Sequence, residues 1–145
     1  SFEDAGDPMQ IDALARRGRA RMGMNLDEVH FHPSIPQHKL QGALKNHGSR
    51  LLSGEGVAVL YDDTVMGGAT DGWIVTPWRL AWKNTFEEPE QLKWPRMDPG
   101  RVYATDGGLV VHGSEISMVK PELAPGAAAL FRELCRLARG EDVPI

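Results

Sequence analysis

Cysteine is scarce in this sequence, which contains one residue of that type, Cys135. A single cysteine forms no disulfide within the chain, and nothing indicates an oxidising compartment, so we expect a cytoplasmic protein. Cys135 stands between Leu134 and Leu137 in a segment with helical periodicity. This position is typical of a small buried side chain and not of a catalytic nucleophile, which would need a base beside it.

Long apolar runs and an excess of positive charge are also missing. No run approaches the ~20 apolar residues that cross a bilayer, so we expect a soluble protein without a transmembrane segment. The 16 Lys and Arg residues are outnumbered by 20 Asp and Glu residues, which gives a net charge of -4. This balance disfavours a general attraction to phosphate backbones, so nucleic acid is not expected as a partner. One group of four arginines is typical of a solvated helix face: Arg16, Arg17, Arg19 and Arg21.

Complete catalytic and cofactor motifs are absent as well. The sequence has no G-x-S-x-G, and the pair Gly67-Gly68 lacks the Gly-Lys-Ser/Thr ending of a phosphate loop. Three histidines could offer imidazoles to zinc, but no acidic third ligand has a recognisable offset from them: His30, His32 and His38. We therefore assign no catalytic residue, no metal and no cofactor, and we expect that the protein is not an enzyme.

Three aspartates lie close to this glycine pair: Asp62, Asp63 and Asp71. Carboxylates in such a place could bind a hard cation. Their spacing does not match the alternating ligands of an EF-hand loop, whereas an Asp side chain readily bonds its own backbone in a turn. Turn formation is therefore the better explanation of these aspartates.

The sequence does contain enough apolar residues for one packed domain with a smaller appendage. Of its 145 residues, 41% are apolar and 25% are charged, as in ordinary globular chains. We expect the appendage to be a helical region over residues 1–48. Apolar residues at helical spacing predict a helix over 9–22 that ends near Gly23, and a second helix from Ser34 or Pro36 to before Gly48. Residues 26–32 alternate between them as an extended segment does.

Residues 49–145 are predicted to form a domain of short antiparallel strands followed by one helix. A helix over 127–138 places its large apolar side chains on one face, and Asp106-Gly107 is a strong hairpin signal. This order predicts an α+β fold in which the last helix closes one end of a β-sandwich or barrel. The strands are predicted at 57–61, 73–76, 80–84, 91–94, 101–105, 109–112 and 115–119.

Four short motifs resemble those of bacterial pleckstrin-homology-like (PH-like) domains. They are YDDT at 61–64, GG at 67–68, DGWIVT at 71–76 and LAWKN at 80–84. In that family a strand ending in Tyr-Asp leads through a glycine-containing turn to "DGF-L-T" and "I-W-K-N" strands, so Trp73 stands in the aromatic position. The resemblance covers residues 52–139 and implies an antiparallel PH-like β-sandwich or barrel capped by a C-terminal α-helix. It also implies a binding scaffold, since members serve as protein or lipid docking modules.

The expected binding surface is centred on the turn between the second and third predicted strands. Trp78 stands beside Pro77 in that turn, where an exposed aromatic side chain would mark a contact surface. The other residues predicted for this surface are Arg79, Lys83, Lys93 and Arg96. We therefore expect an adaptor-like, non-catalytic module that docks a protein partner.

Two alternative functions stay open. The Lys and Arg residues of the strand region, with Arg101 among them, could form a basic mouth for anionic lipid headgroups. Three glutamates in the same region dilute that charge: Glu87, Glu88 and Glu90. A small metal-dependent hydrolase is the other alternative, and metal analysis of the purified protein would test it.

Overall fold

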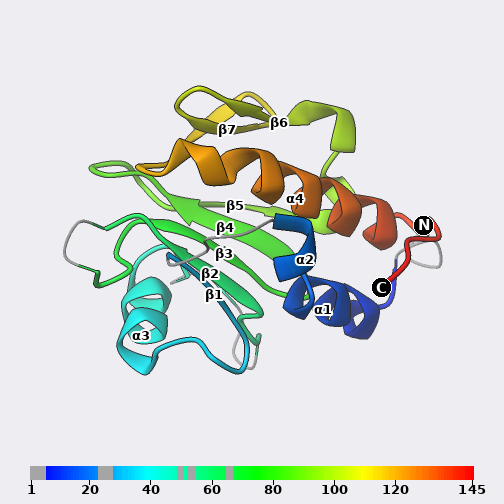
Figure 1. Cartoon of the computed structure of the whole chain (residues 1–145), viewed down its shortest axis with the longest axis horizontal. Helices are drawn as coiled ribbons and strands as arrows, with labels where there is room; N and C mark the ends of the chain where they lie inside the picture. Colours follow the sequence, from blue (N-terminus) through cyan, green and yellow to red (C-terminus); the bar gives the residue numbers. More distant parts are fainter. Residues whose placement is uncertain (1–5, 23–27, 49–50, 52–54, 65–66) are drawn as a thin grey trace.

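The computed structural model of the chain confirms the predicted α+β fold. It describes residues 6–22, 28–48, 51, 55–64 and 67–145. An antiparallel sheet of five strands and another of three pack with a long C-terminal helix, α4 (Ala124–Ala138). Figure 1 shows α4 in the middle of the molecule, between the smaller sheet and the N-terminal helices.

The larger sheet has the order β1-β2-β3-β4-β5, with every neighbouring pair antiparallel. Four of its strands are consecutive in the sequence and confirm the first four strands predicted for the domain: β2 (Val59–Asp62), β3 (Gly72–Val75), β4 (Arg79–Lys83) and β5 (Glu90–Lys93). The fifth, β1 (Val29–Phe31), lies in the extended segment predicted over 26–32 and pairs with β2. The N-terminal region therefore supplies an edge strand to this sheet.

The continuous helix expected over 9–22 is wrong. Two helices occupy this stretch, α1 (Pro8–Arg16) and α2 (Arg19–Met22), and Gly18 lies between them. A Cβ at Gly18 would stand 2.8 Å from the Leu130 side chain, so the break lets the backbone lie close against α4. Both helices contact α4, and the predicted helix end near Gly23 lies outside the described residues. The boundary between residues 1–48 and 49–145 stays a prediction.

Both faces of the larger sheet are covered, which explains why its central strands are apolar at successive positions. Side chains such as Tyr61 and Trp73 belong to the main core beneath α4. Their neighbours Leu60 and Ile74 belong to a second cluster with Ala43 of helix α3 (Gln37–Lys45). An alternating pattern with one polar face would leave one of these two layers without apolar contacts.

The smaller sheet consists of β6 (Val102–Thr105), β7 (Gly108–Val111) and β8 (Ser114–Ser117). The turn between β6 and β7 is the hairpin predicted at Asp106-Gly107. Asn84, just after β4, links the β8 edge of the smaller sheet to the larger sheet. Its side-chain Nδ2 donates to the Glu115 carbonyl at 2.7 Å, and its Oδ1 accepts from the Ser117 amide at 2.9 Å. The amide group of Asn84 therefore does for β8 what a neighbouring strand would do.

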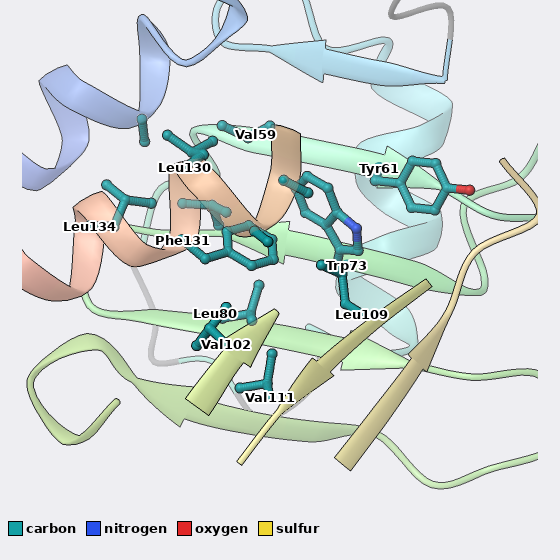
Figure 2. Close-up of a cluster of buried hydrophobic side chains, with 14 of the residues drawn as sticks. Val59, Tyr61, Trp73, Leu80, Val102, Leu109, Val111, Leu130, Phe131 and Leu134 are labelled. Atoms are coloured by element: carbon teal, nitrogen blue, oxygen red, sulfur yellow. The ribbon is translucent and has the colours of Figure 1, made fainter. Parts of the chain in front are cut away.

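The core lies where α4 meets both sheets. Figure 2 shows Phe131 of α4 reaching toward Trp73, with Leu109 of the smaller sheet close by. The rings of Trp73 and Phe131 meet edge to face, with their centroids 4.9 Å apart. Cys135 is buried, as predicted, and Trp73 and Trp82 are buried as well. Within the described residues, no helix has the length and apolar character needed to span a membrane.

Candidate binding sites

Trp78 is presented to solvent by a rigid turn. Its side chain is 44% exposed, although it follows a buried strand. The Thr76 hydroxyl oxygen accepts hydrogen bonds from the Trp78 and Arg79 amides at 3.2 and 3.1 Å. The Trp94 amide donates to the Trp78 carbonyl at 3.1 Å. The backbone is thus held on both sides, and little conformational freedom remains to be lost when a partner contacts the indole ring.

A shallow groove of about 290 Å³ lies beside this indole ring. The turn contributes Pro77 and Trp78, and the start of α1 contributes Pro8 and Met9, whose side chain is 79% exposed. Asp12 and Arg16 also line the groove and form an ion pair at 2.8 Å. The groove therefore combines exposed apolar surface with a neutralised charge pair.

The other predicted surface residues occupy different environments. Arg79 is buried, and its guanidinium donates to Glu55 Oε1 at 2.7 Å and to Gln91 Oε1 at 2.8 Å. Lys83, at the opposite end of β4, is paired with Asp71 at 2.8 Å. These two cations have partners inside the protein and serve the fold.

Lys93 and Arg96 are exposed. They lie at and just after the end of β5 that is beside the turn of Trp78. Lys93 is the cross-strand neighbour of Arg79, which follows Trp78 in the chain. Arg96 comes two residues after Trp94, whose amide bonds the Trp78 carbonyl. Neither side chain forms an ion pair with another described residue. The structure therefore places Lys93 across from the residue that follows Trp78, while Lys83 lies at the other end of β4. That this surface binds a partner stays a prediction.

A larger pocket of about 460 Å³ was not predicted as a site. It lies where the end of β2 meets the segment between β8 and α4. Four parts of the sequence that are distant from one another line it: Glu28, Lys39, residues 61–64 with Gly67, and residues 119–120. Its only sequence signal is the pair Asp62-Asp63, for which turn formation is the predicted role.

Asp62 does hold the connection after β2 together. Its Oδ1 accepts from the Thr64 amide at 2.9 Å and from the Ala69 amide at 3.2 Å, and its Oδ2 forms an ion pair with Lys39. Burial by itself would raise the pKa of Asp62, but the Lys39 ammonium and the Thr64 amide outweigh it and lower that pKa. Asp62 is therefore an ionised structural residue at the wall of the pocket.

Asp63 differs from Asp62 because no described cation is paired with it. One oxygen, Oδ1, accepts from the Tyr61 hydroxyl at 2.5 Å and from the Val119 amide at 2.6 Å. Burial raises the pKa of Asp63, whereas the hydrogen bonds from Tyr61 and Val119 lower it. The nearby carboxylates of Asp71 and Asp62 add to the effect of burial, and the pKa lies above its ordinary value. Burial, followed by the Tyr61 bond to Asp63, likewise raises the pKa of the phenol. The carboxylate of Asp63 is thus fixed in place and incompletely neutralised.

The described residues contain no group of three or more His, Cys, Asp and Glu side chains arranged to hold a metal ion. Comparisons of the chain with family models, with curated proteins and with solved structures found no match.

Proposed function

We propose that this protein is a non-catalytic interaction module of the cytoplasm that docks a protein partner on the surface around Trp78. The observation that carries the proposal is the exposed indole ring beside a groove with Met9 and two prolines. Tryptophan is strongly enriched among the residues that dominate binding energy in protein interfaces. A solvent-exposed tryptophan on a rigid turn suits that role better than a structural one.

We further propose that the strand domain is PH-like. The order of elements supports this: four consecutive strands, β2 to β5, then the three strands of the second sheet, then α4. Strand β1 is an addition at the edge of the larger sheet. Binding residues are often found on loops that a rigid scaffold positions, and the turn of Trp78 is such a loop.

The charge around the groove indicates the chemistry of the partner. Asp12 and Arg16 neutralise each other, as do Glu55 and Arg79. Lys93 and Arg96 remain as positive charges near Trp78 on a chain whose net charge is -4. We therefore propose a partner segment that places an apolar side chain in the groove and carries acidic residues next to it.

The test compares the parent protein with Trp78→Ala. Each is used as bait in an extract of the native host, and a protein retained by the parent is then purified and its affinity measured by calorimetry. Truncating a dominant interface tryptophan costs at least about 2 kcal/mol, so Trp78→Ala should weaken binding about 30-fold or more. Removing acidic residues from the partner segment should weaken binding as well, and more so at low salt.

Tyr103→Ala is the matched control, because Tyr103 is a comparably exposed aromatic residue, at 51%, on the smaller sheet. It should leave the affinity unchanged. Equal affinities for the parent and Trp78→Ala would contradict the proposal, and so would a loss of binding in Tyr103→Ala without a loss in Trp78→Ala.

The lipid-headgroup alternative has less support. Two of its five candidate cations, Arg79 and Lys83, are paired with acidic residues and are not free for a headgroup. We expect no sedimentation with vesicles of anionic lipid at physiological salt. Strong sedimentation that Lys93→Ala abolishes would favour this alternative over protein docking.

A further inference from the structure

The pocket beside Tyr61 contains more negative than positive charge. Three carboxylates line it, those of Glu28, Asp62 and Asp63, against two ammonium groups, Lys39 and Lys120. Lys39 is paired with Asp62, and Lys120 lies 3.4 Å from Glu28. Asp63 is the carboxylate left without a cation among the described residues.

The position of Asp63 is set by the fold. The hydrogen bonds from Tyr61 and from the Val119 amide hold one carboxylate oxygen, and no described residue bonds the other. A carboxylate that is partly removed from water gains the most from an added cation, because the local dielectric constant is low. The oxygen that remains is therefore a preformed acceptor.

An anion would fit the same pocket poorly. It would have to separate Lys39 from Asp62 or Lys120 from Glu28, and it would still lie close to Asp63. The rim has a different character, since the Val119 side chain is 70% exposed there. A ligand with an aliphatic stem and a positive end would satisfy both features.

We propose that this pocket binds an alkylammonium group, held by the carboxylate of Asp63 with Glu28 nearby and with its aliphatic stem against Val119. The group could come from a free amine or from a lysine side chain of a polypeptide. The site is separate from the surface around Trp78, so this proposal does not depend on the docking function.

Probes of defined chemistry test the proposal on the full chain by ¹⁵N NMR. Pentylammonium should shift the amide signals of Thr64, Val119 and Lys120 in a saturable way. Pentanol, which has the same stem without the charge, should not do so, and neither should inorganic phosphate. N-acetyl-lysine methylamide then separates the sources: tighter binding than pentylammonium indicates a polypeptide lysine, and weaker binding indicates a free amine.

Asp63→Asn removes the charge and keeps an oxygen that can accept the Tyr61 and Val119 hydrogen bonds, so the fold should persist. It should weaken pentylammonium binding at least tenfold, and Glu28→Gln should weaken it severalfold. Asp106→Asn, at the exposed turn between β6 and β7, is the matched control and should change nothing. Equal shifts with pentanol, saturable shifts with phosphate, or full affinity in Asp63→Asn would each overturn the proposal. If Asp63→Asn does not fold, the comparison of probes on the parent decides the question.

Discussion

At the scale of single residues, His47 is an ionisable side chain in an unusual place. It follows α3, it is buried, and neither ring nitrogen has a hydrogen-bond partner among the described residues. Burial lowers its pKa to about 4, although the Thr70 backbone and the Asp71 carboxylate favour the protonated form. The unfolded chain takes up this proton near the ordinary pKa of 6.5. Acid therefore stabilises the unfolded state relative to the folded one.

This difference predicts how stability depends on pH. The contribution of neutral His47 is complete above pH 6.5 and is lost as the pH falls toward 4, at about 1.4 kcal/mol per pH unit. The parent should lose about 2 kcal/mol between pH 7 and pH 5 in urea unfolding, and His47→Leu should lose much less. His38→Leu changes an exposed histidine and should keep the parent's dependence.

Burial also lowers the pKa values of His30 and His112. These two residues are present in all three proteins, so the difference between the variants isolates His47. Parallel pH profiles for the parent and His47→Leu would show that His47 does not carry the effect.

At the scale of elements, α4 is the part on which the others pack. Both N-terminal helices contact it, as do β6, β7 and the short 3-10 turns that precede β6 and α4. Leu134, in the middle of its buried face, has no exposed surface. The helical periodicity of the apolar residues in α4 predicts by itself that this face is buried against the strands.

Leu134→Asp should therefore unfold the strand domain. An unpaired carboxylate buried at this position costs several kcal/mol, comparable with the ~5–15 kcal/mol that stabilises a typical domain. Urea unfolding followed by tryptophan emission measures the effect, because Trp73 and Trp82 are buried in the same core. Arg136→Asp puts the same side chain on the exposed face and should cost about 1 kcal/mol or less. An unchanged midpoint for Leu134→Asp would mean abandoning the PH-like assignment.

At the scale of the whole molecule, the N-terminal region is part of the packed structure. Strand β1 covers the edge of β2, and α1 and α2 cover one side of α4 with buried side chains such as Leu14. Without them, the edge of β2 and an apolar surface of α4 would be open to solvent. Exposed strand edges and apolar patches promote self-association.

A fragment of residues 49–145 should therefore melt at a lower temperature than the full chain and should associate. Circular dichroism during heating and size-exclusion chromatography measure the two effects. Adding the N-terminal residues as a separate peptide should partly restore the melting temperature. A monomeric fragment with the stability of the full chain would instead support an independent domain beginning at residue 49.

The candidate site was predicted in part. The position of Trp78 in a turn beside Pro77 predicts an exposed aromatic side chain, and the indole ring is exposed. Arg79 carries the same charge as Lys93 in the sequence, yet it is buried with Glu55 and Gln91. Its partners are 24 and 12 residues away along the chain, so no local pattern could reveal them.

The sequence by itself determined the order of the strands in residues 49–145 and the C-terminal helix that follows them, because these depend on periodicity and turn residues within a few residues of each other. It also determined that the face of α4 with Leu134 is buried. Only the tertiary structure decided that β1 joins β2, that the chain breaks at Gly18 to lie against Leu130, and that Asp63 shares a pocket with Glu28 and Lys120. These contacts join residues far apart in the chain, and their energies depend on the packing of the whole molecule.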